Sequence, residues 1–156
     1  MADITAKERE IVEEFGLFDD WMGRYEHLID LGRALPSMAA DFQTDAYKIK
    51  GCQSQVWLHA HHSENQVFFD ANSDAAITKG LIALLVRVLS GQPAITIINA
   101  DLAFLDQLEM KEHLSPTRKN GLDAMIKQMK LYATAFAKLD ANAGATPLAH
   151  SQTAKR

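Results

Sequence analysis

Cysteine is almost absent from this chain of 156 residues: Cys52 is the only one. A single thiol cannot close a disulfide within the chain, so the fold does not depend on oxidation, and this fits a reducing compartment. A domain of this size buries roughly 68–70% of the surface that its unfolded chain exposes. The sequence therefore predicts one stable domain that needs neither a disulfide nor a metal to fold.

Long apolar runs and an excess of positive charge are also missing. The longest apolar-rich stretch, 80–86, is followed at once by Arg87, whereas a membrane span needs roughly 18 uncharged residues. The first fifteen residues are charged and have no apolar signal-peptide core. The formal net charge of −4 argues against a nucleic-acid partner. We therefore expect a cytoplasmic protein with no membrane and no nucleic-acid partner.

Two helices are predicted in the N-terminal part. Thr5 and Glu8 have the spacing of a capping box, and apolar residues follow at helical spacing. Asp20 is the N-cap candidate of a second helix over 21–35, which Pro36 ends.

The hydrophobic period changes from 3.6 to 2 at residue 47. Apolar and basic residues alternate over 47–50, and alternation resumes over 56–61. The stretch 63–66 is a turn signal, and 67–71 returns as a strand, which predicts a β-hairpin.

More helices are expected after the hairpin. Ser73 is the predicted cap of a long helix that Gly91 ends, and Asp101 is the predicted start of a short one. The run 94–100 fits either a strand or a helix. Ser115 followed by proline is a strong start signal for a last helix that continues to about residue 139.

The order of these elements indicates an α+β fold, in which helices cover one face of an antiparallel sheet. We expect a single domain over 1–139. The small and polar residues 140–156 have no hydrophobic period, which predicts a disordered tail.

Cys52 stands where the chain can present a side chain. Gly51 allows the backbone to turn sharply, and the polar residues 53–55 follow, so the pair predicts a thiol at a loop tip. Lys48 and Lys50 would lower the pKa of this thiol if their side chains pointed toward it. The plain alternative is a small buried hydrophobic residue.

Two further roles for the cysteine were weighed. His59 and His61 share a strand face, but Cys52 would lie roughly 23 Å from His59 along an extended strand. No paired-cysteine motif accompanies them, so no metal site is predicted. A Cys-dependent hydrolase would use Cys52 with a histidine such as His27, His113 or one on the strand. No local signature marks a partner.

Four segments resemble the SufE family of sulfur acceptors in iron–sulfur cluster assembly. IKGCQSQVWL, residues 49–58, is similar to the family's cysteine loop. Segments 25–36, 73–85 and 113–126 are similar to its helices, in the family's order, and together the four span most of 20–137. The Gln-Ser-Gln after Cys52 is closer to SufE proper than to the CsdE branch.

The resemblance implies a fold related to the IscU scaffold and a specific activity. Cys52 would take persulfide sulfur from a SufS-type cysteine desulfurase, stimulate that enzyme and pass the sulfur to SufB of the SufBCD complex. Pyridoxal phosphate belongs to the desulfurase, so this chain needs no cofactor and is a transfer partner rather than an enzyme. It lacks the three cysteines of IscU, so it is not expected to build clusters.

The resemblance also implies the other site residues. Gly51, Gln53 and Ser54 share the loop motif. Asp74 either favours a helix N-terminus electrostatically or contacts the desulfurase. Arg118 opens the last helix, where a cation is unfavourable, so it is assigned to partner contact. The rival interpretations remain the hydrolase and a structural domain with a buried cysteine.

Overall fold

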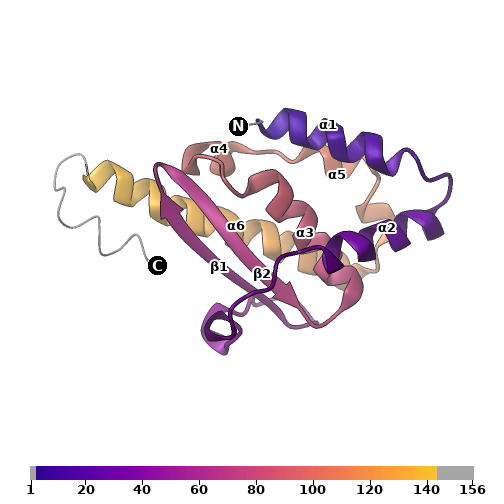
Figure 1. The fold of residues 1–156 in the computed structure, drawn as a ribbon, viewed down its shortest axis with the longest axis horizontal. Coiled ribbons are helices and arrows are strands. Elements are labelled where there is room, and N and C mark those ends of the chain that lie inside the picture. Colours follow the sequence, from indigo (N-terminus) through magenta and orange to yellow (C-terminus); the bar gives the residue numbers. More distant parts are fainter. Residues whose placement is uncertain (1–2, 144–156) are drawn as a thin grey trace.

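The computed structural model describes residues 3–143, and Figure 1 shows their arrangement. A hairpin of two antiparallel strands lies against a group of helices, and the longest helix runs behind it. The elements in chain order are α1 (Ile4–Phe15), α2 (Trp21–Arg33), the 3-10 helices η1 (Ala40–Phe42) and η2 (Asp45–Tyr47), β1 (Val56–Ser63), β2 (Gln66–Ser73), α3 (Ala76–Leu89), α4 (Ala94–Asn99), α5 (Ala103–Gln107), η3 (Lys111–His113) and α6 (Pro116–Ala143). The α+β class expected from the sequence is confirmed.

The first two helices begin at aspartates. The Asp3 side chain accepts a hydrogen bond from the Ala6 amide at 2.7 Å, so the predicted capping box is wrong. Thr5 lies inside α1, and Glu8 accepts a hydrogen bond from the Phe104 amide at 3.2 Å instead. Asp20 is the N-cap of α2, as predicted, and accepts from the Gly23 amide at 2.9 Å.

The predicted hairpin is confirmed, but the alternating run before it is not a strand. β1 and β2 pair from Val56 opposite Ser73 to Ser63 opposite Gln66. Residues 45–47 form a 3-10 turn, in which the Tyr47 amide donates to the Thr44 carbonyl at 3.0 Å. Only an isolated bridge pairs residue 48 with β1.

Three of the four later helix starts differ from or refine the prediction. Ser73 is the last residue of β2 and its hydroxyl accepts from the Ala75 amide, while α3 begins at residue 76. The ambiguous run forms the short helix α4. Leu102, in the left-handed region at φ 55°, precedes α5 in place of Asp101.

The last helix begins as predicted. The Ser115 hydroxyl accepts a hydrogen bond from the Arg118 amide at 3.3 Å. The helix continues to Ala143, past the expected end at residue 139. The predicted tail 140–156 therefore starts within a helix, and its residues 144–156 lie outside the described part of the chain.

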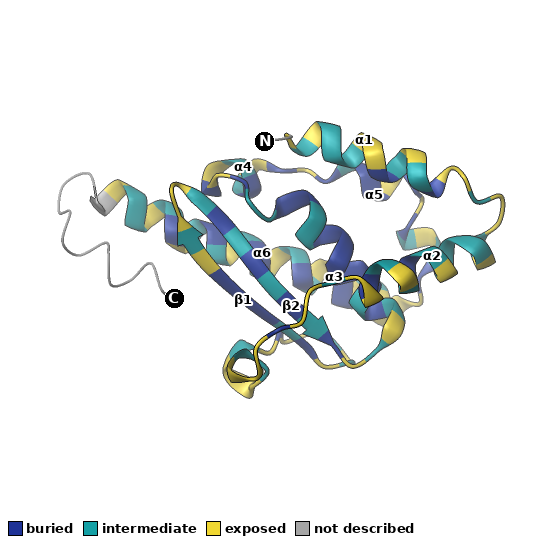
Figure 2. Cartoon of the chain, viewed as in Figure 1, coloured by how far each residue is buried: buried dark blue, intermediate teal, exposed yellow. Residues whose placement is uncertain are grey.

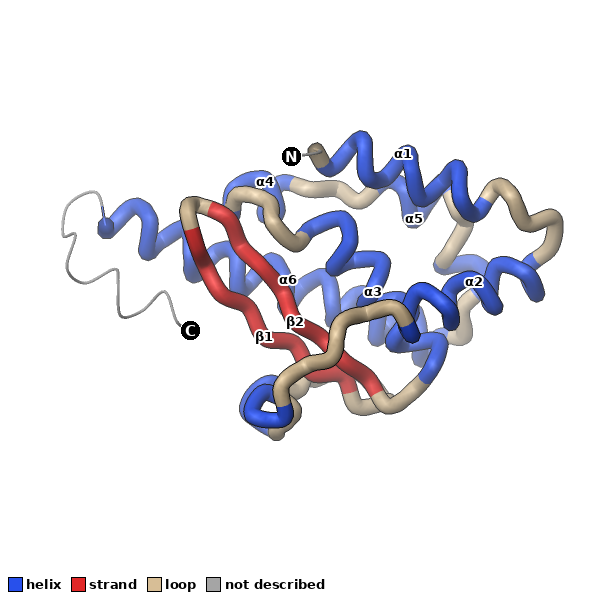
Figure 3. The backbone as a smooth tube through the Cα atoms, in the orientation of Figure 1, coloured by secondary structure: helices blue, strands red, loops and turns tan. Residues whose placement is uncertain are grey.

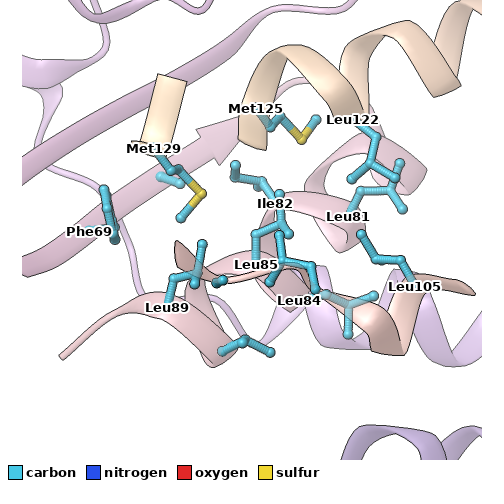
Figure 4. Packing of buried hydrophobic residues seen from close by; sticks show 14 of the residues in the cluster. Phe69, Leu81, Ile82, Leu84, Leu85, Leu89, Leu105, Leu122, Met125 and Met129 are labelled. Carbon is cyan, nitrogen blue, oxygen red and sulfur yellow. The ribbon is translucent and has the colours of Figure 1, made fainter. Parts of the chain in front are cut away.

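The core lies between one face of the hairpin and the helices. Figure 2 shows that α3 is buried along most of its length. Alternate residues of both strands point toward α3. Helix α6 packs on the other side of the core with a face on which apolar residues recur at helical spacing. Figure 4 shows where the three elements meet, with Phe69 from β2, Ile82 and Leu85 from α3, and Met125 and Met129 from α6.

Helices α2 and α3 cross in direct backbone contact. A Cβ atom built on Gly80 would overlap the carbonyl oxygen of Leu28, and one built on Gly32 would lie 2.8 Å from the Gly80 amide nitrogen. Neither position has room for a side chain, so these glycines set the distance between the two helices.

The segment between α2 and β1 crosses the face of the hairpin that the helices leave open, as the tan trace in Figure 3 shows. Phe42 of this segment stacks on His59 of β1 at a ring-centroid distance of 3.7 Å. Asn72 of β2 donates to the Gln43 side chain at 2.9 Å. This crossing brings the chain to the cysteine loop at the start of β1.

Candidate functional site

Cys52 lies in the loop that leads into β1, against the first turns of α6. Gly51 has φ +93°, a left-handed value that glycine adopts without strain. The turn directs the thiol toward α6, where Sγ lies 3.6 Å from the Gly121 carbonyl oxygen and donates a weak hydrogen bond to it. The cysteine is half-buried and packs against the edge of the core, so it is not the exposed loop tip that the sequence predicted.

The thiol borders a cavity of about 250 Å³ between the loop, α3 and the start of α6. Its lining is largely polar, with hydroxyl, amide and guanidinium groups around one thiol. A small anionic or polar group would fit this space beside the sulfur. The lining residues are Cys52, Gln53, Ser54, Thr78, Leu81, Ser115, Thr117, Arg118, Gly121 and Met125.

Burial raises the pKa of the Cys52 thiol above its ordinary value, because a thiolate loses solvation there. The lysines do not reverse this effect. Lys48 pairs with Asp45 at 3.2 Å, and Lys50 lines a separate depression on the other side of the loop. These lysines therefore do not lower the pKa of Cys52, as the sequence allowed, and burial favours the protonated thiol.

The structure brings most of the predicted site residues together. Gln53, Ser54 and Arg118 line the cavity with Cys52, and Gly51 shapes the turn. Asp74 does not line it.

Asp74 instead ties the end of the cysteine loop to the start of α3. Its carboxylate accepts hydrogen bonds from the Gln55 amide at 3.0 Å and from the Gln55 side chain at 3.2 Å. It directly precedes Ala75, the N-cap of α3, so a favourable charge at the helix start is compatible with this role.

Apart from Arg118, sequence reasoning missed the residues that α6, its cap and α3 add to the cavity. Ser115 was identified only as a cap, and Thr117, Gly121 and Thr78 were not identified. The sequence predicted where α6 starts. Nothing in the local sequence indicated that this start would face the cysteine loop, which lies about sixty residues earlier in the chain.

Within residues 3–143, no histidine lines the cavity around Cys52. His113 stacks on Trp21 at a centroid distance of 3.8 Å, and His27 lies 3.2 Å from Glu14. A Cys-dependent hydrolase needs a base within hydrogen-bond reach of the thiol, so the described site gives that alternative no support.

Three potential metal ligands, two histidines and an aspartate, lie together elsewhere in the described chain. Ligand atoms of His59, His61 and Asp70 all lie within 4.8 Å of one another on the hairpin. The sequence indicated the two histidines but not Asp70, because the aspartate comes from the other strand and only the register places it opposite His59.

A hairpin-and-helix fold that holds one half-buried thiol beside a helix start defines a small single-thiol domain of the α+β class. The family model described as "SufE: Fe-S metabolism associated domain" matches residues 9–133. The chain belongs to the SufE family, and its membership indicates a sulfur-transfer role in iron–sulfur metabolism.

Relatives agree with this assignment, and a solved structure shares the fold. The chain is 40% identical to an uncharacterized SufE-like protein of Rhizobium etli over 78% of this chain and 85% of that protein. It is 39% identical to SufE-like protein 1, chloroplastic/mitochondrial, of Arabidopsis thaliana over 82% of this chain and 35% of that longer protein. The solution structure of a hypothetical protein from Thermus thermophilus matches the fold with a TM-score of 0.68 at 18% identity, covering 83% of this chain and 94% of that one.

The helices were also compared with the requirements of a membrane span. None of those in residues 3–143 combines the length and the apolar composition that crossing a bilayer requires.

Proposed function

We propose that this protein accepts persulfide sulfur on Cys52 from a SufS-type cysteine desulfurase and delivers it for iron–sulfur cluster assembly. The observation that supports this most is the position of the chain's single thiol, half-buried at a polar cavity beside the start of α6. A sulfur carrier needs one accessible sulfur with space beside it for a second sulfur atom.

The transfer is a thiol–persulfide exchange. The Cys52 thiolate attacks the outer sulfur of the desulfurase's cysteine persulfide, a new S–S bond forms, and the old S–S bond breaks. The desulfurase cysteine leaves as a thiolate, and the proton lost by Cys52 balances its charge. No electrons are exchanged with an outside redox partner, and pyridoxal phosphate serves only as the cofactor of the desulfurase. The reaction needs no acid–base triad in this chain.

The raised pKa makes the resting thiol a poor nucleophile, because the thiolate is the reactive form. Docking of the desulfurase would have to draw the cysteine out of its contact with Gly121 or bring positive charge close to it. Either change lowers the pKa and starts the transfer only on the partner. The same shelter would protect the product, since persulfides are readily lost to reductants.

Of two exposed residues beside the loop, Arg118 would contact the desulfurase directly and Asp74 would act indirectly. The guanidinium of Arg118 borders the cavity and can pair with a carboxylate across the interface. Asp74 acts from the opposite side by holding the loop through Gln55. Arg118→Ala is expected to weaken desulfurase stimulation while leaving the folded state unchanged.

The test is intact-mass spectrometry after incubation with a SufS-type desulfurase and L-cysteine. The expected result is an adduct of one sulfur atom that a reductant removes and that Cys52→Ser lacks. Ser63→Ala is the control, because it changes an exposed serine at the far end of β1 and keeps both the thiol and the cavity. No adduct on a chain that iodoacetamide still alkylates, with an active desulfurase present, would overturn the proposal.

The downstream steps are separate expectations. Radiolabelled sulfur loaded on Cys52 should appear on SufB when the SufBCD complex is added, and the desulfurase should release alanine faster in the presence of this chain. The cytoplasmic location expected from the sequence stays a prediction. The Arabidopsis relative is named as a chloroplastic/mitochondrial protein.

A further inference from the structure

The group of His59, His61 and Asp70 lies on the open face of the hairpin, away from the core. Val56, Leu58 and Ala60 point toward the helices and are buried, so the alternate residues His59 and His61 point to the other face. Asp70 is the direct cross-strand partner of His59. The strand period and the register therefore place two imidazoles and a carboxylate at adjacent positions.

Neighbouring aromatic rings hold both imidazoles. His59 is buried between Phe42, which stacks on it with planes 9° apart, and Tyr47, which contacts it edge-on. His61 stacks on Phe68, its own cross-strand partner, at 5.2 Å. The buried ring of His59 is fixed in this way and loses little rotamer freedom when it binds a ligand, which is the preorganisation that a binding site requires. The exposed ring of His61 keeps some freedom to turn.

The distances suit a transition-metal ion. His59 Nδ1 lies 3.3 Å from Asp70 Oδ2, and a tetrahedral zinc ion with ligand bonds of about 2.0–2.2 Å places its ligand atoms roughly 3.3–3.5 Å apart. The third ligand atom lies within 4.8 Å of the others. Because His61 is exposed, a small rotation of its ring is enough to close this gap.

We propose that His59, His61 and Asp70 form a binding site for a divalent transition-metal ion such as Zn²⁺. Two imidazoles and one carboxylate are a ligand set that zinc accepts, with a fourth position left for water or a small ligand. This inference departs from the expectation, drawn from the sequence, that the chain has no metal site. It does not rest on the sulfur-transfer proposal, because Cys52 lies in a different cavity.

The role of His61 distinguishes a metal site from a purely structural contact between His59 and Asp70. A hydrogen bond between His59 and Asp70 alone would make this pair structural and would leave His61 without a task. A metal site needs all three side chains, and loss of a ligand weakens binding by at least the 10–100-fold that loss of an outer partner costs.

The experiment is a competition between the untagged full chain and a chromogenic chelator for Zn²⁺ at neutral pH. His61→Gln and Asp70→Asn are each expected to weaken the affinity at least about 100-fold, with far-UV circular dichroism unchanged. Cobalt(II) should give visible absorption bands of a tetrahedral site without the near-ultraviolet band of a thiolate ligand.

Three variants serve as controls. Cys52→Ser tests binding by the thiol, His113→Gln tests nonspecific binding by a histidine elsewhere, and His150→Gln covers a histidine outside the described residues. All three should retain the wild-type affinity. Absence of binding by the wild type at micromolar zinc, an unchanged affinity in His61→Gln, or a lost affinity in Cys52→Ser would each overturn the proposal.

Discussion

Glycine serves two different purposes in two regions of this molecule. At the crossing of α2 and α3, Gly32 and Gly80 have ordinary backbone angles, and what matters is that they lack a Cβ atom. In the cysteine loop, Gly51 has φ +93° and its Cβ position meets only the side chain of Ala124, at 3.3 Å. One region needs the missing volume, and the other needs the backbone conformation.

The difference separates stability from function. A side chain at the crossing must push two helices apart, and this affects the whole core. A side chain in the loop changes the local backbone angle, and this affects the direction of one thiol. Substitutions in the two regions should therefore differ in which measurement they change.

The largest effect on stability is expected for Gly80→Ala. The new methyl group would overlap the backbone carbonyl oxygen of Leu28, and a backbone atom cannot move aside as a flexible side chain can. We expect a loss of about 3 kcal/mol or more in the free energy of unfolding, measured by urea denaturation. Gly16→Ala is the control, since its Cβ would lie 3.4 Å from the nearest atoms, and it should stay within about 0.5 kcal/mol of the wild type. Equal stabilities would contradict the close crossing.

Gly51→Ala should lower the free energy of unfolding less than Gly80→Ala does, but it should reduce sulfur transfer more. An alanine at this positive φ costs about 1–2 kcal/mol, and relaxing this strain turns the thiol away from its cavity. Desulfurase-dependent persulfide formation, followed by mass spectrometry, should fall strongly.

Gly91→Ala is the matched control for this prediction. Gly91 also has a positive φ, +86°, and its Cβ would have ordinary contact with Phe68. It should lose a similar amount of stability and keep full persulfide formation. A similar loss of persulfide in both variants would mean that strain anywhere, rather than the direction of the thiol, controls the transfer.

Asp74→Ala should have a smaller effect, confined to the loop. The variant removes both hydrogen bonds that hold Gln55, and exposed bonds of this kind contribute about 0.5–1 kcal/mol. Hydrogen exchange of the Gln55 amide should accelerate while core amides of α3 stay unchanged. Asp45→Ala, which removes only the exposed pair with Lys48, should leave that amide as it is. Protection of Gln55 in Asp74→Ala would rule out the proposed tie.

The smallest effect concerns the charge of Cys52. Because burial raises its pKa in the folded state, folding binds the thiol proton more tightly. The stabilisation is complete below the thiol's pKa in the unfolded chain and is lost as the pH rises through the folded-state pKa. Relative to Cys52→Ser, the wild type should lose slightly more stability on going from neutral to alkaline pH, measured by urea denaturation. If the wild type instead gained stability relative to Cys52→Ser as the pH rises, the pKa of the thiol would be lowered in the folded state.

The parts of the fold that the sequence predicted are those defined by local chemistry. Asp20 before α2, the turn of the hairpin, and Ser115 before α6 each act on neighbours within a few residues. Thr5 and Glu8 failed because Asp3 offers the same capping chemistry two residues earlier, and a contact with distant Phe104 occupies the Glu8 carboxylate. Local patterns alone could not decide between such equivalent caps.

The candidate site also has a part that local sequence predicted and a part that depends on distant contacts. Cys52 and its loop neighbours are contiguous, so their pattern was legible from the sequence. The Gly121 carbonyl and the Thr78 hydroxyl come from helices whose positions depend on packing across the core. The direction of the thiol pKa followed from this packing too, since burial outweighed the two nearby lysines.

The hairpin also shows how a two-stranded sheet avoids joining another sheet. Several outward-facing backbone groups on its two outer edges are already hydrogen-bonded within the molecule. On β1, the Val56 carbonyl accepts from the Ile49 amide and the Leu58 carbonyl from the Tyr132 hydroxyl. On β2, residues 90–92 bond to Val67 and Phe69. Free strand edges are templates for aggregation, so these contacts reduce the free backbone on which the strands of another molecule could pair.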